Sequence, residues 1–221
     1  SKSEKEIIRE KLRQEGKDSA HNSEEEDDRE ARETKEDAKV EEMIKYTPLG
    51  GEECPVEADA EEIEYSMVYR IPKIENLDQA KHLKRLMLRK NLIKRIEGLE
   101  TNVELEELEL YDNRIRVIEN ISHLQQLVIL DLSFNRIKAI EGLGPLVNLK
   151  KLFLTSNRIN KIQGLESLTM LEVLDLGDNK ISKIEGLDTL TSLREFYMAK
   201  NKLVKITGLA NLVNLTTLAL Q

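Results

Sequence analysis

Apolar residues return along most of the chain at a fixed interval of 22 residues. The interval is easiest to follow at asparagine, which recurs in six successive turns without insertion, at Asn91, Asn113, Asn135, Asn157, Asn179 and Asn201. Before each asparagine, two apolar positions enclose one variable residue, as in Leu130-Asp131-Leu132, and an isoleucine or leucine follows two positions after it. Alternation over a short segment predicts a β-strand, and its regular return predicts that equivalent strands stack side by side.

The repeated form LxxLxLxxNxI is typical of a leucine-rich repeat. It predicts an α/β solenoid of 22-residue repeats, with a parallel β-sheet on the concave face and short 3₁₀ or α turns on the convex face. Five inward-facing aliphatic positions per repeat predict one continuous core that no single repeat could form. The asparagine is expected to bind free backbone groups of its own and adjacent turns, which makes an asparagine ladder.

A second periodic column contains only glycine and asparagine: Asn76, Gly98, Asn120, Gly142, Gly164, Gly186 and Gly208. These residue types tolerate a positive φ best, so a left-handed turn is predicted at this position of every repeat. One repeat departs from the pattern, because Asn102 stands where other repeats have Leu124 or Leu146. We expect Val103 to fill that space imperfectly.

Charge divides the chain into an acidic leader and a nearly neutral remainder. Residues 1–60 hold 11 Lys and Arg against 20 Asp and Glu, whereas the rest holds 23 against 22. Few aliphatic residues occur in the leader, so a disordered acidic tail is expected over residues 1–60. Residues 61–76 are expected to form an N-terminal cap and half repeat, in which IEYSMVYR replaces the first strand. Residues 77–221 are expected to form the repeats, the last of them truncated and without a C-terminal cap.

The residue between the two leucines of each strand decides what the sheet displays. Because the leucines point into the core, the middle residue must face the concave surface. Acidic and aromatic residues dominate this column and form a candidate partner-binding row, the ridge: Glu109, Asp131, Phe153, Asp175 and Tyr197. Flanking contacts are predicted at Met87, Tyr111, Lys151 and Glu195. Exposed aromatic residues among charges are typical of a protein-binding surface, and the alternative is an ordinary solvated sheet face.

Other function classes are disfavoured by the residues present. No histidine stands with cysteines or repeated carboxylates at metal-ligand spacing, so we expect no catalytic residues, no enzyme activity and no metal site. The glycines of the repeats are isolated, which disfavours a phosphate-binding loop, and no cofactor is expected. The acidic leader and the nearly neutral array disfavour nucleic acid as a partner. The sequence contains no run of about 18 apolar residues, so no membrane span is expected.

Several strings are more specific than the repeat itself: LRKNLIKRIEGLE, LEELELYDNRIRVIENI, ILDLSFNRIKAIEGL and KKLFLTSNRINKI. Over residues 64–221 the chain resembles the regulatory subunit 7 family of type-1 protein phosphatase, nuclear leucine-rich-repeat regulators first known from yeast mitosis. The resemblance implies a non-catalytic regulatory subunit, located in the nucleus and also in the cytoplasm. It implies that the concave face binds the phosphatase catalytic subunit and controls its maturation, activity or location.

Carried over by residue, the resemblance assigns phosphatase binding to Asp131, Phe153, Asp175 and Tyr197, with Glu109 as a neighbour. It also implies a further phosphatase inhibitor protein as a third member of the complex. Acidic residues on the ridge indicate a basic patch on the partner. Two alternatives use the same fold: a structural adaptor of the cilium or centrosome, and an adaptor of the spliceosome. The identity of the partner would separate the three.

Overall fold

The computed structural model describes residues 26–68 and 70–220, which divide into two units. The first unit extends to Tyr46 and contains one described helix, α2 (Glu26–Met43). The second unit begins at Thr47 and contains eight strands of three residues each. They are β1 (Glu62–Glu64), β2 (Arg85–Met87), β3 (Glu107–Glu109), β4 (Ile129–Asp131), β5 (Lys151–Phe153), β6 (Val173–Asp175), β7 (Glu195–Tyr197) and β8 (Thr217–Ala219).

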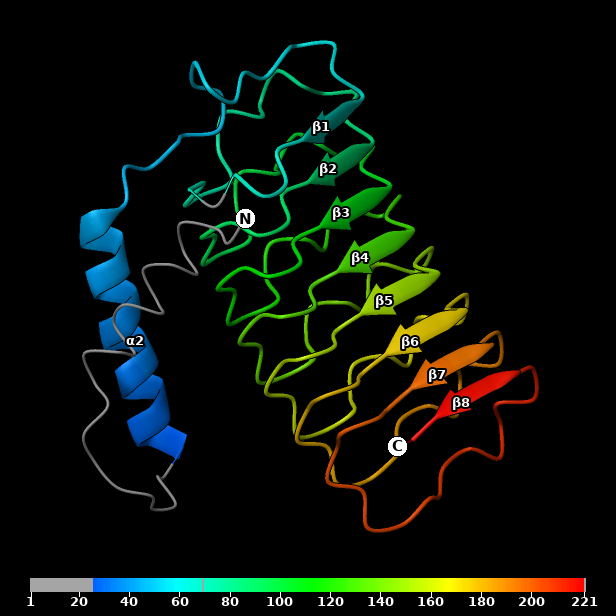
Figure 1. Cartoon of the computed structure of the whole chain (residues 1–221). Coiled ribbons are helices and arrows are strands. Elements are labelled where there is room, and N and C mark those ends of the chain that lie inside the picture. The colour runs from blue at the N-terminus through cyan, green and yellow to red at the C-terminus, as the bar shows by residue number, and fades with distance from the viewer. Residues whose placement is uncertain (1–25, 69, 221) are drawn as a thin grey trace. The chain divides into compact units, whose positions relative to one another are not determined.

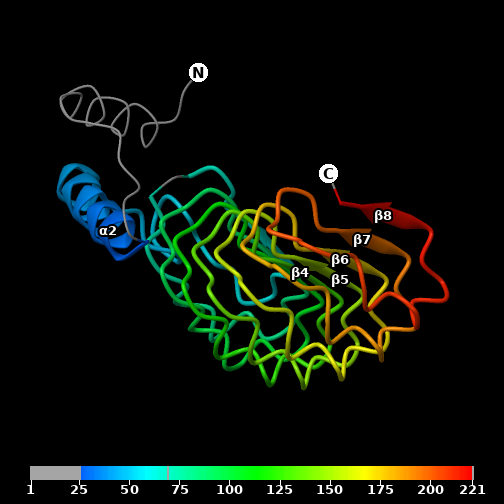
Figure 2. The same cartoon turned by 90° about the horizontal axis from the view of Figure 1, so that it is seen from below.

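The eight strands form one parallel sheet, in which each strand pairs with the next along the chain. The register follows the sequence repeat, since Leu108 pairs with Leu130 and Leu130 with Leu152. In Figure 1 the arrows stack in chain order. Figure 2 shows the strands along the inner side of the solenoid and the return segments along its outer side. The predicted leucine-rich-repeat solenoid is therefore confirmed.

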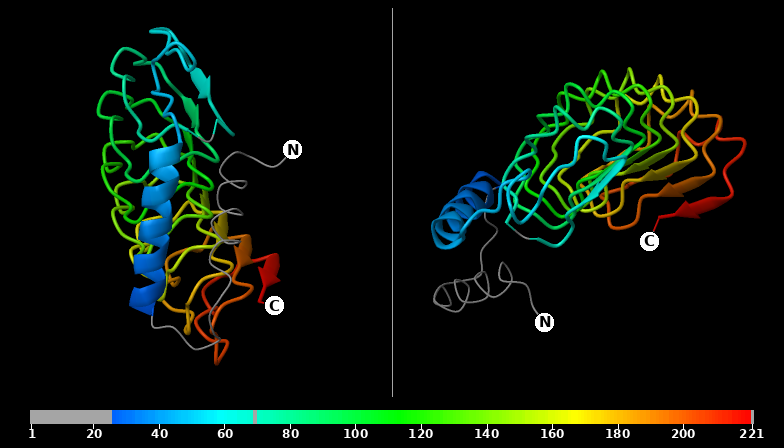
Figure 3. Two further views of the ribbon diagram at one scale, coloured as in Figure 1. Left: turned by 60° about the vertical axis from the view of Figure 1, so that its left-hand side comes forward. Right: turned by 90° about the horizontal axis from the view of Figure 1, so that it is seen from above.

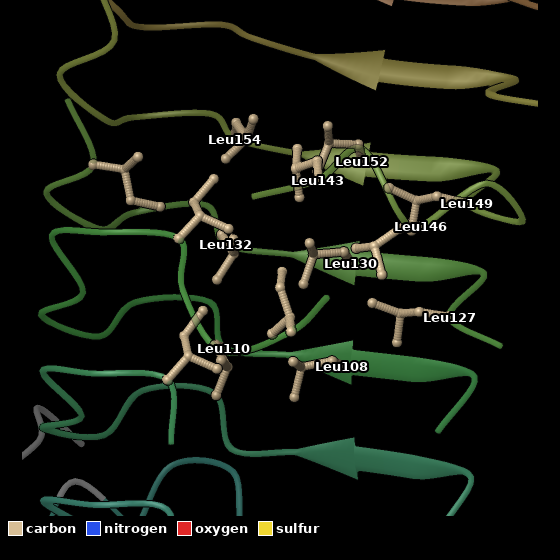
Figure 4. Packing of buried hydrophobic residues seen from close by; sticks show 14 of the residues in the cluster. Leu108, Leu110, Leu127, Leu130, Leu132, Leu143, Leu146, Leu149, Leu152 and Leu154 are labelled. Atoms are coloured by element: carbon tan, nitrogen blue, oxygen red, sulfur yellow. The ribbon is translucent and has the colours of Figure 1, made fainter. Parts of the chain in front are cut away.

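The core of this unit lies between the sheet and the return segments. Figure 3 shows successive turns of the solenoid stacked one after another, and the strand register places equivalent positions of neighbouring repeats side by side. In Figure 4 leucines from the strands, such as Leu130, and from the return segments, such as Leu143 and Leu146, point into one interior. All three are fully buried, and they belong to one hydrophobic cluster that extends from Leu49 to Leu212. Each repeat is thus stabilised by packing against both of its neighbours.

The predicted asparagine ladder is present. The Nδ2 atom of Asn135 donates to the carbonyl of Leu110 in the preceding repeat at 2.9 Å and to its own Leu132 at 3.0 Å. Its Oδ1 atom accepts a hydrogen bond from the backbone N–H of Ile115 at 2.9 Å. The same three kinds of bond recur at Asn113, Asn157, Asn179 and Asn201. Each asparagine therefore satisfies backbone groups that the strands leave unpaired.

The predicted left-handed turn occurs at all seven positions of the glycine and asparagine column, as at Gly142 with φ of 71°. A Cβ atom there would lie 3.0 Å from the carbonyl oxygen of Ile118, which explains why glycine is common. A second left-handed column, which the sequence did not reveal, immediately precedes the ladder asparagines. Its φ values lie between 50° and 57°, at Lys90, Asp112, Phe134, Ser156, Asp178 and Lys200.

The return segments consist of consecutive tight turns. The N–H of Leu146 donates to the carbonyl of Leu143 at 2.9 Å, and the N–H of Leu149 donates to that of Leu146 at 3.0 Å. These are the i to i+3 bonds of a 3₁₀ turn, and the described part of the repeats contains no helix. The short 3₁₀ turns expected on the convex side are therefore present as isolated turns.

The irregular repeat is filled differently from our expectation. Asn102 is itself fully buried, whereas Val103 remains 50% exposed, so the prediction that Val103 fills the leucine position was wrong. The Nδ2 atom of Asn102 donates to the carbonyls of Ala80 at 2.8 Å and Leu77 at 3.3 Å. These two bonds let a polar side chain occupy an apolar position, because a buried donor that finds acceptors avoids most of its desolvation cost.

The structure differs from the disordered tail expected over residues 1–60. Helix α2 lies within it, because glutamate, lysine, arginine and alanine are strong helix formers even where aliphatic residues are scarce. Residues 47–60 belong to the repeat unit, in which Leu49 and Cys54 are buried. The rest of that expectation, over residues 1–25, falls outside the described residues.

The N-terminal cap contributes a strand of its own. We expected IEYSMVYR to replace the first strand, but β1 pairs in parallel with β2 and places Ile63, which is buried, beside Leu86. The hydroxyl of Tyr65 donates to the carbonyl of Pro55 at 2.6 Å, which ties the preceding loop to this strand. The cap therefore adds a strand to the sheet, because it retains one buried aliphatic, Ile63, at the strand position.

Candidate protein-binding site

The five residues of the ridge lie side by side on one face of the sheet. They come from β3 to β7, and the sheet register pairs Glu109 with Asp131, Asp131 with Phe153, Phe153 with Asp175, and Asp175 with Tyr197. Neighbouring strands in a sheet lie about 4.8 Å apart. All five side chains are partly exposed, whereas Leu130 and Leu132 on either side of Asp131 are fully buried. The ridge is thus a contiguous surface row, and its role in binding stays a prediction.

Two of the carboxylates in the ridge are held in place by their own turns. Asp131 accepts a hydrogen bond of 2.8 Å from the backbone N–H of Ser133, and Asp175 accepts one of 2.9 Å from Gly177. Such i to i+2 bonds restrict the side-chain rotamer. Burial raises the pKa of Asp131, the hydrogen bonds from Ser133 oppose that shift, and the charge of Asp175 adds to it. Both aspartates are therefore fixed before any partner arrives.

Basic side chains at the N-terminal end of the sheet are engaged within the sheet. Arg89 forms ion pairs with Glu109 at 3.0 Å and with Glu64 at 3.3 Å, and the Nε atom of Arg85 donates to Glu62 at 2.8 Å. Burial raises the pKa of Glu109, although the charge of Arg89 opposes that shift. The negative charge of the concave face is therefore concentrated over the strands that follow β2.

Over β3 to β7, five carboxylates and one cation occupy the strand positions that are not fully buried: Glu107, Glu109, Asp131, Asp175, Glu195 and Lys151. Between them lie three apolar side chains on adjacent strands, Ile129, Phe153 and Val173. This part of the surface is thus acidic with an apolar centre. Such a combination suits a protein partner that presents basic residues around an apolar side chain.

The predicted flanking residues lie around the ridge in different ways. Met87 ends β2 and Lys151 begins β5, each beside the row. The hydroxyl of Tyr197 donates to Glu195 at 2.7 Å, and this bond raises the pKa of Tyr197. Tyr111 packs against Phe134 with ring centroids 4.8 Å apart.

Phe134 was missed by sequence reasoning, although it is 45% exposed. The signal that could have found it is its column, in which every other residue is polar or charged: Lys90, Asp112, Ser156, Asp178 and Lys200. An aromatic residue at a position that is polar in the other repeats is not required by the fold and therefore indicates a candidate functional residue.

Within residues 26–68 and 70–220, no group of three or more His, Cys, Asp or Glu side chains is arranged to hold a metal ion. No helix in that part of the chain is long and apolar enough to cross a membrane. What the site presents is a preorganised surface of carboxylates and aromatic rings.

Comparison with known proteins identifies the class. A family model described as "Leucine Rich repeats (2 copies)" matches residues 103–145 and 147–189. Internalin C2 from Listeria monocytogenes has a similar structure, with 30% identity and a TM-score of 0.70 over 74% of this chain and 72% of its own. The chain belongs to the leucine-rich-repeat family. Members of this family are typically non-enzymatic scaffolds for protein interactions.

Two further solved structures are similar at lower identity. A leucine-rich-repeat protein from Leptospira interrogans shares 24% identity and a TM-score of 0.53, over 65% of this chain and 44% of its own. The internalin inlF of Listeria monocytogenes shares 22% identity and a TM-score of 0.45, over 72% of this chain and 60% of its own. The chain thus spans less than two thirds of each of these two structures. None of the curated proteins compared with the chain matches it.

Proposed function

We propose that the protein is a non-catalytic regulatory subunit that binds the catalytic subunit of type-1 Ser/Thr protein phosphatase through its concave face. The observation that carries this proposal is the unbroken row in which carboxylates and aromatic rings alternate: Asp131, Phe153, Asp175 and Tyr197. The resemblance to the regulatory subunit 7 family assigns phosphatase binding to the same row. Binding by this row would control the maturation, activity or location of the phosphatase.

The alternation suits a strong and selective contact. Phe153 lies between two aspartates, so a partner that buries its ring also brings basic groups next to both carboxylates. Buried aromatic anchors supply much of the binding energy of protein interfaces, whereas surrounding charges mainly set specificity and association rate. Since Asp131 and Asp175 are already held by backbone hydrogen bonds, little side-chain entropy is lost when they pair.

The proposal extends to the setting in which the subunit acts. We assign it to the nucleus, with the cytoplasm as a second location. A phosphatase inhibitor protein is the expected third member of the complex. Because the ridge lies on the sheet face, the proposed third protein would bind the solenoid at a surface other than the ridge.

Calorimetry with the purified type-1 phosphatase catalytic subunit tests the proposal. The double variant Phe153→Ala and Asp175→Ala should bind at least tenfold more weakly than the unchanged chain, a loss of about 1.4 kcal/mol. Val147→Ala, at an exposed position of a return segment, serves as the matched control and should keep full affinity. Circular dichroism establishes that each variant is folded.

A folded chain that does not bind the phosphatase would overturn the proposal. The partner would then be sought by affinity capture, in which ciliary or centrosomal proteins and splicing factors distinguish the two adaptor roles. Equal affinity of the double variant and the unchanged chain would leave phosphatase binding in place but remove it from the ridge.

A further inference from the structure

Tyr111 and Phe134 form an aromatic pair at the carboxyl edge of the sheet. Tyr111 follows the end of β3 by two residues, and Phe134 follows the end of β4 by three. Their ring centroids lie 4.8 Å apart, and the ring planes are inclined by 50°. Tyr111 is partly exposed, and Phe134 keeps 45% of its surface accessible. The pair therefore adds an aromatic surface beside the ridge without belonging to it.

The backbone of Phe134 is in a conformation that its side chain disfavours. Its φ of 56° lies in the left-handed region, where the Cβ of a bulky residue crowds the neighbouring carbonyl. The same position of the flanking repeats holds Asp112 and Ser156, so the fold does not require a ring there. Phe134 also gains no full burial in exchange. Residues held in such disfavoured backbone conformations cluster at functional sites, ligand contacts among them.

The surroundings of the pair favour a cationic ligand. Glu109, two residues before Tyr111, and Asp131, three residues before Phe134, place their carboxylates on the concave surface. The faces of aromatic rings attract cations, and the planar guanidinium of arginine stacks on them especially well. Arg89, on the neighbouring repeat, is engaged by Glu64 and Glu109. A cation that a partner supplies would therefore meet both the rings and the carboxylates.

We propose that Tyr111 and Phe134 are a second contact point, at which an arginine side chain of the protein bound by the ridge stacks on the aromatic pair. The proposal rests on the proposed function in that the ridge and the pair share one partner. The pair lies two to three residues beyond the ridge along the chain, and a chain of that length spans no more than about 11 Å even when fully extended. One segment of a partner can therefore occupy both.

The variant Phe134→Asn separates a binding role from a structural one. Asparagine tolerates a positive φ, so this change removes the ring and relieves the backbone at the same time. We expect the type-1 phosphatase catalytic subunit to bind Phe134→Asn at least fivefold more weakly, while the Tm equals or exceeds that of the unchanged chain. Lys200→Asn makes the same substitution at the same position of another repeat, where φ is 57°, and should not alter the affinity.

The reverse pattern, a lower Tm with unchanged affinity, would overturn the inference and make the ring structural. If the double variant Phe153→Ala and Asp175→Ala loses binding and Phe134→Asn does not, the proposed function is supported. The proposed arginine contact at Tyr111 and Phe134 is then wrong.

If the unchanged chain does not bind the phosphatase, the proposed function fails, and the pair is tested directly by nuclear magnetic resonance. The probe is a blocked peptide with two arginines, compared with its uncharged citrulline counterpart. Shifts at Tyr111 and Phe134 that require arginine and vanish in Phe134→Asn would support the contact. Equal shifts with both peptides, no shifts with either, or arginine shifts that survive the substitution would overturn it.

Discussion

The Oδ1 atom of Asn157 accepts a hydrogen bond of 2.9 Å from the backbone N–H of Ile137, one repeat earlier in the chain. Replacing Asn157 by alanine leaves that buried N–H without its acceptor and removes the donor to Leu132. Unsatisfied buried groups cost about 1–3 kcal/mol each, so we expect a loss of about 3 kcal/mol in urea denaturation.

Asn201→Ala is the matched comparison for this variant. Asn201 makes the same bonds but is partly exposed, so water can replace them. We expect a loss of about 1 kcal/mol or less there. Equal losses at the two positions would contradict a role for burial in the ladder.

Asn102→Leu should stabilise the protein by about 1 kcal/mol. The Oδ1 atom of Asn102 is buried and finds no hydrogen-bond partner among the described residues. The carbonyls of Ala80 and Leu77, which accept from Asn102, also accept from backbone N–H groups. Leucine therefore removes an unsatisfied oxygen and leaves both acceptors paired.

The reciprocal change, Leu124→Asn, places an amide at the equivalent position and should destabilise the protein by about 3 kcal/mol, measured in the same urea titration. A loss of stability in Asn102→Leu would show that the two amide bonds outweigh the unsatisfied oxygen.

Gly98→Ala should destabilise the protein more than Gly98→Asn does. The φ of Gly98 is 70°, and a Cβ atom would lie 2.4 Å from the carbonyl oxygen of Ile74. Either side chain forces a local shift, but asparagine can recover a hydrogen bond. At the equivalent position, the Nδ2 atom of Asn120 donates to the carbonyl of Ile96 at 2.8 Å.

We expect alanine to cost about 2 kcal/mol and asparagine about half of that, measured by thermal denaturation. Gly144→Ala is the control, since its Cβ would meet only Ser167, at 3.9 Å, and the Tm should stay within about 1 °C of the unchanged chain. A greater loss with asparagine than with alanine would contradict the proposed hydrogen bond.

Asp131→Asn should make the folded protein more stable at pH 7. Burial raises the pKa of Asp131, so the folded state binds its proton more tightly than the unfolded state does. Stability is therefore lost as the pH rises from the ordinary aspartate value of about 4 through the raised pKa. An asparagine can still accept the hydrogen bond from Ser133 without carrying that charge.

The stabilisation by Asp131→Asn should shrink as the pH falls from 7 towards about 4, because the carboxyl of the unchanged chain takes up its proton more readily in the folded state than in the unfolded state. Urea titrations at the two pH values measure the difference. A stabilisation of equal size at both would show that ionisation of Asp131 is not its cause. At pH 7 the same variant should bind the phosphatase more weakly, so that stability and affinity change in opposite directions.

The regular parts of the fold could be predicted because every repeat carries the same residue pattern and therefore adopts the same local geometry. The ladder asparagines and the glycine and asparagine column recur in register, so each turn is independent evidence for the same role. The ridge could be placed for a related reason. Side chains alternate along a strand, and the burial of Leu130 and Leu132 leaves Asp131 only the concave face of the sheet.

The irregular parts could not be predicted, since they depend on single substitutions. Asn102 is buried because the carbonyls of Leu77 and Ala80 lie within reach of its amide. Nothing in the sequence distinguishes that outcome from the burial of Val103. The helix α2 was missed because the expectation of disorder considered only the scarcity of aliphatic residues.

The sequence by itself therefore determined the repeat, the strand register, the turn column and the face on which the ridge lies. Only the tertiary structure decided that Arg89 is engaged by Glu64 and Glu109, that β1 extends the sheet, and that Phe134 lies against Tyr111 in a left-handed conformation. The physical reason is that the residues in each of these contacts lie about one repeat apart in the sequence. Periodicity fixes the direction of each side chain within its repeat, whereas these contacts join residues from neighbouring repeats and depend on which atoms meet there.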